Sequence, residues 1–327
     1  MRLTHTIVGL CYRPLFCLSN DCEQLMYRTW LGSALSAILL TLCCGCGQTV
    51  DGITPVGGEQ PSEAELRRFM RRLHLDLAGT APDDTYLDDA VARLLADSTA
   101  AGRAAIADEL LAQQEFADTY VAELENRVFG GQSAESRYQQ LCGVVRVVVP
   151  ECMQCPLNGD TCGDCACAPI VTYVGERDVI LTSAADLAAG TPTGTLERRY
   201  ASTIAFRSFF NTPNTLAVGY FDVFLGRPAE LDEMDNAAAM LQGALLPGSP
   251  AGVLFHRHGS DMTDFIDILF SSENYREAVV IGVFQRYLGR RPTGVELSHF
   301  SASVDSSSPD ALGVIRAVTS SREYFEQ

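Results

Sequence analysis

Three segments of the chain repeat one pattern, and this self-similarity is the feature that most constrains its fold. Each segment has an apolar stretch, a turn with glycine and proline, and later a short polar group before an aromatic residue. The third copy has Leu-Gly-Arg-Arg-Pro at 288–292 and Ser-Ser-Arg-Glu-Tyr at 320–324. The second has Leu-Gly-Arg-Pro at 225–228 and Ser-Ser-Glu-Asn-Tyr at 271–275. Recurrence of this kind is typical of repeated helical units, so it predicts a mainly α fold.

The first copy is more divergent, with Leu-Ala-Gly-Thr-Ala-Pro at 77–82 and Gln-Gln-Glu-Phe at 113–116. Ser62 and Glu65 have the spacing of a helix capping box. The apolar residues that follow at helical spacing are Leu66, Phe69, Met70, Leu73 and Leu77. Gly79 can supply the left-handed residue that ends such a helix. The sequence therefore predicts a helix that begins after Ser62 and ends before Gly79.

The same spacing predicts the buried faces of later helices. After a cap at Asp83 or Asp84, the inward residues of the first copy are Tyr86, Leu87, Val91, Leu94, Leu95, Ile106, Leu110 and Leu111. In the third copy they are Val279, Val280, Val283, Phe284, Leu288, Ala311, Leu312, Ile315 and Val318.

Two resemblances follow from these motifs. The Leu-Gly-Arg-x-Pro turn with its Ser-Ser-x-Glu-Tyr ending resembles a bacterial helical domain of unknown function that recurs in secreted and surface proteins, with copies at about 213–275 and 276–327. The Arg-Arg-x-x-Leu-Asp-Leu-x-Gly-x-x-Pro run at 71–82 is similar to another domain of unknown function, found on surface proteins, often beside cytochrome-c-like modules. Neither resemblance implies a catalytic residue. The alternative interpretation is a set of unrelated helical hairpins.

Between the first and second copies the composition changes to a cysteine-rich segment. Its cysteines are Cys142, Cys152, Cys155, Cys162, Cys165 and Cys167. The run 143–149 is rich in strand-forming valine, and 170–174 and 179–182 flank a polar Gly-Glu-Arg-Asp that suits a hairpin turn. We therefore expect a small β insert with little core of its own, stabilised by cross-links.

Disulfides and metal binding are both open for these cysteines. The Cys-x-x-Cys pairs suggest a zinc site in a cytosolic protein, whereas an even number of cysteines in an exported chain favours three disulfides. Free thiols are a third interpretation. The pairing cannot be read from sequence, because six cysteines allow 15 connectivities. Covalent haem attachment is excluded, since no Cys-x-x-Cys-His occurs.

The N-terminal region has the pattern of a signal peptide. The uncharged run from Trp30 to Leu42 follows Arg28 and is too short to span a bilayer comfortably. Residues 1–25 do not fit such a signal, because acidic residues and cysteines precede the apolar run. We therefore interpret 1–25 as an upstream extension and 26–45 as the signal peptide, which begins at Met26.

The end of this signal resembles the bacterial lipobox, which implies a lipid on Cys46. Gly45 suits the position before cleavage, but Cys43 stands where leucine is usual, so Cys43 and Cys44 are also candidate acceptors. The pattern is also compatible with a plain cleaved signal or with an uncleaved anchor helix. By family analogy, Gln48 near the cleavage point favours the outer membrane over the inner one.

Charge excludes some classes of partner. The chain has 327 residues and a formal charge of −17, which would repel nucleic acid and anionic lipid. Its 24 basic residues are all arginine, which most simply reports a GC-rich genome. Residues 46–327 are longer than one core usually serves, so two or three packed units are expected.

The sequence has only weak candidates for a catalytic or metal site. His256 and His258 lie two apart beside Asp261, and on a strand they would point the same way and could share a metal. Two ligands make a weak site, and surface histidines are the simpler interpretation. His74, between apolar neighbours in the first copy's helix, is interpreted as a packed or half-exposed histidine. The chain has no nucleophile elbow, phosphate loop or dinucleotide fingerprint, and we expect no cofactor.

The predicted organisation is a mainly α protein of three helical-repeat units, with a small disulfide-stapled β insert between the first and second. The segments after the signal are a tether (46–60), unit 1 (61–135), the insert (136–190), unit 2 (191–275) and unit 3 (276–327). The leading hypothesis is a non-enzymatic envelope lipoprotein, periplasmic or surface-exposed, that presents these units to a protein or polysaccharide partner. The competing hypotheses are an envelope metal-dependent hydrolase that uses the His256 and His258 loop, and an accessory protein of an envelope redox system.

Overall fold

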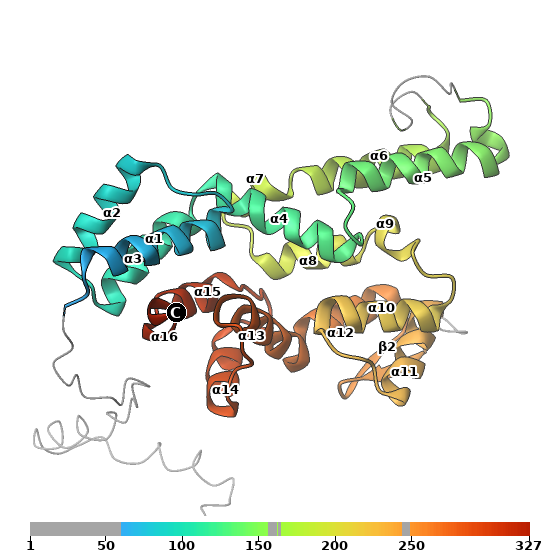
Figure 1. The fold of residues 1–327 in the computed structure, drawn as a ribbon. Coiled ribbons are helices and arrows are strands. Elements are labelled where there is room, and N and C mark those ends of the chain that lie inside the picture. The colour runs from blue at the N-terminus through green and yellow to red at the C-terminus, as the bar shows by residue number, and fades with distance from the viewer. Residues whose placement is uncertain (1–59, 156–161, 163–164, 244–248) are drawn as a thin grey trace, which may run out of the picture. The chain divides into compact units, whose positions relative to one another are not determined.

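The computed structural model describes residues 60–155, 162, 165–243 and 249–327, and these residues are mainly helical (Figure 1). The first nine helices are α1 (Glu63–Ala78), α2 (Asp84–Ala96), α3 (Ala100–Leu111), α4 (Gln114–Val128), α5 (Ala134–Val148), α6 (Ala168–Leu181), α7 (Ser183–Ala188), α8 (Thr193–Ala201) and α9 (Ile204–Arg207). The others are α10 (Pro213–Leu225), α11 (Leu231–Gln242), α12 (Met262–Ser271), α13 (Glu273–Leu288), α14 (Gly294–Ser303), α15 (Leu312–Thr319) and α16 (Arg322–Glu326), with a 3-10 turn η1 (Pro150–Cys152) after α5. The predicted mainly α fold is confirmed.

Helix α1 begins and ends where the sequence predicts. The Ser62 hydroxyl accepts a hydrogen bond from the Glu65 amide at 3.3 Å, and the Glu65 carboxylate accepts one from the Ser62 amide at 2.8 Å. The helix ends at Gly79, which has the left-handed φ of 71°. Asp83 then caps α2 by accepting from the Tyr86 amide at 2.8 Å. Leu95 is an exception to the predicted core, since it is 39% exposed.

The second and third copies of the repeat have the same turn. Helices α10 and α13 end at Gly226 and Gly289, with φ values of 60° and 65° that favour glycine. The polar groups that close these copies also act alike. Ser272 accepts a hydrogen bond from the Tyr275 amide and begins α13, as Ser321 does for α16.

An arginine follows each of these glycines and binds a glutamate on the next helix. Arg227 donates to both carboxylate oxygens of Glu233 at 2.7 Å, and Arg290 donates to those of Glu296 at 2.7 and 2.9 Å. Arg227 also lies over the ring of Phe221, and Arg290 over that of Phe284, at 5.1 and 5.2 Å. We call each Arg–Glu pair a repeat clamp. The clamp explains why the motif has arginine between glycine and proline, because a planar guanidinium binds carboxylate through two bonds.

The core is a continuous set of buried apolar side chains in which helices of all three copies take part. Around Tyr220, the rings of Phe206 and Phe265 lie at 5.0 and 4.9 Å, in edge-to-face contact. Residues 59–327 form one compact unit, although chain length predicts two or three. The repeats therefore share a core instead of each enclosing its own.

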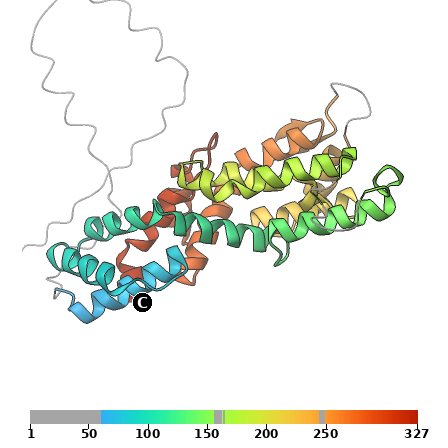
Figure 2. The ribbon, with the colours of Figure 1, turned by 90° about the horizontal axis from the view of Figure 1, so that it is seen from above.

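The β insert predicted at 136–190 is wrong in its secondary structure. Residues 143–149 lie mostly in α5. Both expected strands lie in the single helix α6, apart from its C-cap Thr182, and α6 lies beside α5 in Figures 1 and 2. Tertiary contacts override the valine preference for strands. The Gly-Glu-Arg-Asp segment that was expected to form a turn lies within α6. Its Glu176 accepts hydrogen bonds from the Tyr138 hydroxyl at 3.2 Å and the Ile204 amide at 3.0 Å.

The two-stranded sheet of the described residues lies elsewhere, in the extra length of the second copy. Strands β1 (Gly252–Leu254) and β2 (Arg257–Gly259) are antiparallel, with Gly252 opposite Gly259. The two residues between the strands, Phe255 and His256, have φ values of 49° and 64°. This is the two-residue turn that matches the twist of a hairpin.

Candidate functional site

The cysteine-rich segment joins α5 and α6 into what we call the cross-linked hairpin, residues 134–181. Its disulfides pair Cys142 with Cys162, Cys152 with Cys167, and Cys155 with Cys165, with Cα atoms 5.4, 5.4 and 5.3 Å apart. Along the sequence, the loop that Cys142 and Cys162 close overlaps the other two loops, because Cys162 lies between the two cysteines of each other pair. The end of α5, the connecting chain and the start of α6 are therefore tied to one another, which restricts the unfolded chain.

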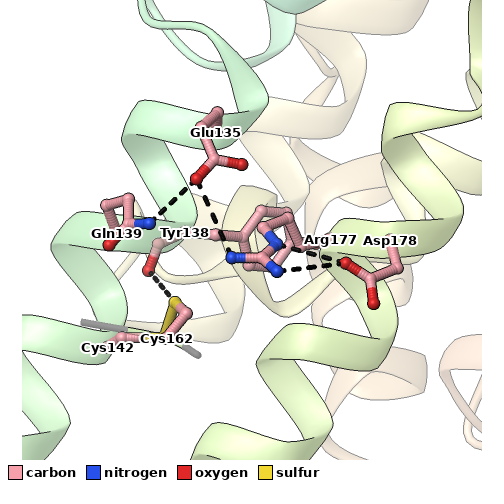
Figure 3. The surroundings of a disulfide bond; sticks show 7 residues. All are labelled: Glu135, Tyr138, Gln139, Cys142, Cys162, Arg177 and Asp178. Carbon is pink, nitrogen blue, oxygen red and sulfur yellow. Dashed lines mark hydrogen bonds and ion pairs between the residues drawn. A yellow bond between two sulfur atoms is a disulfide. The ribbon is translucent and has the colours of Figure 1, made fainter. Parts of the chain in front are cut away.

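Polar contacts beside the first disulfide also join the two helices (Figure 3). The Cys162 sulfur lies 3.2 Å from the Tyr138 carbonyl oxygen in α5. On α6, Arg177 lies 3.2 Å from Asp178 and 3.8 Å from Glu135 of α5. Figure 3 shows Arg177 between these two carboxylates. The α5 and α6 pair is thus held by an ion pair as well as by sulfur.

The outer face of the cross-linked hairpin is unusually apolar. Of the fourteen large hydrophobic side chains that are exposed in the described residues, seven belong to this hairpin: Val144, Val147, Val148, Met153, Val171, Val179 and Leu181. The three valines of α5 have the spacing of one helix face, so they form a contiguous stripe, which we call the valine stripe. Their exposed fractions are 52%, 68% and 62%. Apolar patches of this kind commonly mark interaction sites.

Three sulfur atoms of the hairpin lie unusually close together. The Sγ atoms of Cys155, Cys165 and Cys167 are within 4.8 Å of one another, and among the described residues this is the one group of three or more potential metal ligands so close. The pairing uses these sulfurs in disulfides, so a zinc site here would require their reduction. Disulfides are the arrangement that the geometry favours.

The two candidate histidines do not converge on a site in the described part of the chain. His256 lies in the turn between β1 and β2, and His258 lies on β2, opposite Val253. Both side chains are exposed. Asp261, the neighbouring carboxylate, caps α12 by accepting from the Thr263 and Asp264 amides at 2.8 and 3.0 Å. The observed geometry therefore gives the hydrolase hypothesis no support.

A buried carboxylate at the centre of the fold was not predicted. Glu197 of α8 is 6% exposed. One of its oxygens accepts from Arg127 of α4 at 2.7 Å and from the Tyr120 hydroxyl at 3.2 Å, and the other accepts from the Tyr275 hydroxyl at 3.0 Å. Helices α4, α8 and α13 meet at this one side chain. A buried charge needs such a complete set of partners, because an unpaired one is strongly destabilising.

The network around Glu197 favours the protonated forms of the tyrosines and the arginine that contact this carboxylate. Burial, and then the Glu197 charge, raise the pKa values of Tyr120 and Tyr275 well above the usual range, so both hydroxyls remain donors. Partial burial lowers the pKa of Arg127, but the Glu197 charge, the two tyrosines and the hydrogen bond to Glu197 together outweigh it, and the net shift is upward. The guanidinium therefore stays charged at every physiological pH.

A cleft opens beside this network, between α4 and α13. It has a volume of about 210 Å³. Its polar lining residues are Tyr120, Glu123, Arg127, Glu197, Arg286 and Tyr287, and its apolar ones include Leu124, Phe224, Val279, Val283 and Ile315. Arg286 of α13 pairs with Glu123 of α4 across the cleft and donates to the Asp76 carbonyl oxygen at 3.1 Å. A second hollow of about 280 Å³ shares Arg127, Phe224, Ala278 and Gly282 with the cleft.

Sequence reasoning missed the cleft because its residues come from distant helices and have no motif. Arg127, Glu197 and Arg286 look like ordinary surface charges in sequence. A partial signal was the aromatic residue that closes each repeat. The hydroxyls of Tyr275 and Tyr324 both donate to carboxylates of earlier helices, to Glu197 at 3.0 Å and to Asp76 at 2.7 Å. The tyrosines that close these repeats therefore donate hydrogen bonds to other helices as well as packing in the core.

The predicted lipid acceptor Cys46 lies outside the described residues, as do the signal peptide, the upstream extension and nearly all of the tether. Within the part that is described, no helix is both long and apolar enough to cross a bilayer.

Comparison with known proteins adds no family. No family model matches the chain, and no curated protein and no solved structure matches it either. The two resemblances seen in the turn motifs thus stay predictions.

Proposed function

We propose that this chain is a non-enzymatic envelope lipoprotein that acts as an interaction module, with a protein partner bound by the cross-linked hairpin. The observation that carries the proposal is the valine stripe on a hairpin that three disulfides stabilise. The helical repeats support this hairpin as a scaffold. No family or relative contributes to the proposal.

The valine stripe is difficult to explain by the fold alone. Val144, Val147 and Val148 remain exposed although they lie beside the buried Leu141 and Val145 on α5. Valine is a poorer helix former than arginine, lysine, glutamine or glutamate, so these side chains at the exposed positions would favour the helix. A partner that covers the stripe would remove its apolar surface from water, which stabilises the complex.

The chemistry of the hairpin favours protein over polysaccharide. The exposed large hydrophobic side chains are valines, a leucine and a methionine, and the two tyrosines, Tyr138 and Tyr173, are buried or partly buried. Sugar rings are generally bound by exposed aromatic faces and polar side chains. Aliphatic stripes on helices instead suit the apolar core of a protein interface.

The proposed location in the envelope depends on the N-terminal sequence, in which a short apolar run precedes Cys46. We propose that residues 26–45 form a lipoprotein signal, that Cys46 carries the lipid, and that the outer membrane is the destination. The membrane is then contacted through the lipid. The protein is either periplasmic or exposed on the cell surface.

Metabolic labelling with a fatty acid tests the proposed lipidation of Cys46. We expect the full chain to incorporate label, the Cys46→Ser variant to lose it, and Cys43→Ser and Cys44→Ser to keep it. Absence of label from the unmodified chain would contradict lipidation, and loss of label in Cys43→Ser or Cys44→Ser alone would move the acceptor.

Affinity capture from envelope fractions tests the interaction. The full chain is compared with Val147→Glu and with the matched control Val295→Glu, because Val295 is equally exposed, at 72%, but lies on α14. We expect a saturable protein partner that Val147→Glu reduces at least tenfold and the control leaves unchanged. Equal loss in both variants, or capture of polysaccharide alone, would contradict the proposal.

A further inference from the structure

A glycine without a packing role lies at the cleft between α4 and α13. A Cβ atom added to Gly282 of α13 would meet no atom within 4 Å. Gly219 of α10 is different, since a Cβ there would overlap the ring of Phe210. A glycine inside a helix is destabilising relative to alanine. Packing explains Gly219, whereas Gly282 leaves open space that no described side chain fills.

Arg127 presents unused donors to that space. Its side chain is 46% exposed, and among the described residues its one hydrogen-bond partner is Glu197, which takes one nitrogen. The buried Glu197, held by Tyr120 and Tyr275, fixes the guanidinium in position. A guanidinium oriented in this way is suited to a carboxylate, which it binds through short charge-assisted hydrogen bonds.

The other cation of the cleft is already occupied. Arg286 pairs with Glu123 and donates to the Asp76 carbonyl oxygen. Arg127, through the nitrogens that Glu197 leaves free, is therefore the group of the cleft that can bind a carboxylate. The apolar part of the lining, which we call the apolar wall, includes Leu124, Val283, Ile315 and Phe224. The volume of about 210 Å³ exceeds the roughly 150 Å³ cavity that binds benzene, so a molecule somewhat larger than benzene fits.

We propose that the cleft between α4 and α13 is a binding site for a small carboxylate with an apolar tail, whose carboxylate binds Arg127 and whose tail lies against the apolar wall. Gly282 provides the space. This site is separate from the cross-linked hairpin, and the proposal does not depend on the lipid or on a protein partner.

Calorimetric titration of the purified full chain with 3-phenylpropionate tests the site. The matched uncharged probe is 3-phenylpropanol. We expect saturable one-site binding of the carboxylate and binding of the alcohol that is weaker by about tenfold or more, because a charge-assisted hydrogen bond is lost. Absence of carboxylate binding, or equal affinity for the two probes, would overturn the proposal.

Two pairs of variants separate the cleft from the rest of the surface. Gly282→Leu fills the cleft and is expected to abolish binding, whereas Gly175→Leu, at a helical glycine of α6 that also has no atom within 4 Å, keeps it. Arg127→Gln is expected to weaken the carboxylate at least tenfold but not the alcohol, with Arg198→Gln on α8 as its control. Unchanged affinity in Gly282→Leu, or equal loss in Gly175→Leu, would refute the assignment. If Arg127→Gln does not fold, the glycine pair still decides the question.

Discussion

The repeat clamp of the third copy makes a prediction about acid stability. Arg290 donates two hydrogen bonds to Glu296, at 2.7 and 2.9 Å, and two to Glu323, each at 2.6 Å. The hydrogen bonds from Arg290 are the main reason that the pKa of Glu296 falls from 4.5 to about 2. The perturbation is Arg290→Gln, which removes the cation and leaves both carboxylates in place.

The magnitude follows from that shift. One pKa unit corresponds to about 1.4 kcal/mol, so the Glu296 shift would be worth about 3 kcal/mol if the pair were fully shielded from water. The side chains of Arg290 and Glu296 are 33% and 25% exposed, and solvent screening weakens such a pair. We therefore expect Arg290→Gln to lower the free energy of unfolding by about 1–2 kcal/mol at pH 7.

The sign of the pH dependence is fixed by the direction of the shift. A carboxylate whose pKa is lowered by folding stabilises the protein above its unfolded pKa of about 4.5, and this contribution disappears as pH falls toward about 2. The difference between the wild type and Arg290→Gln should therefore shrink steadily below pH 4.5 in urea unfolding. The control is Arg322→Gln, since Arg322 pairs with Glu326 but is 76% exposed, and we expect it to lower stability little. A loss that does not change with pH, or an equal loss in the control, would refute the reasoning.

Two further predictions concern packing and cross-links. Gly219→Ala should destabilise the protein by about 1–3 kcal/mol in urea unfolding, because the new methyl group overlaps the Phe210 ring, whereas Gly282→Ala should be neutral or stabilising; similar losses in both would contradict the packing. Replacing Cys142 and Cys162 together by serine should lower the free energy of unfolding by about 2–4 kcal/mol, since the bridge closes a loop with a sequence separation of 20. Wild-type stability in this double variant would count against the pairing.

Local signals in the sequence predicted the helix ends well. The Ser62 and Glu65 capping box and the glycines of the repeat turns depend on residues within a few positions of one another, so short motifs determine them. The repeat also located the clamps indirectly, because Arg227 and Arg290 occupy equal positions in their copies. Local geometry that repeats in sequence is therefore recoverable without a structure.

The insert was mispredicted because its decisive contacts are distant in sequence. Valines at 144–149 favour strands by intrinsic preference, but Val145 is buried with Tyr138 and Cys142 at helical spacing. Gly175, which suggested a turn, lies inside α6. Its polar neighbours Glu176 and Arg177 have partners on α9 and α5, respectively. Here the packing of one helix on another overrides the strand preference of valine, and no local sequence motif indicates that packing.

The cleft was beyond sequence reasoning for a similar reason. Arg127, Glu197 and Arg286 lie on three helices, and their pairing depends on how those helices cross. By contrast, the cysteines could be recognised as a set, although their connectivity could not. Chemistry concentrated in one segment is visible in sequence, and chemistry assembled from several helices is not.

Site-specific photo-crosslinking in cells that express the full chain tests the central claim most directly. A photoreactive residue is placed at Val147 in the valine stripe, or at Val295 of α14 as the equally exposed control. We expect one discrete protein adduct from position 147, reduced by Val144→Glu in the same stripe, and none from position 295. Equal or absent crosslinking at the two positions would contradict the assignment of the cross-linked hairpin as an interaction surface.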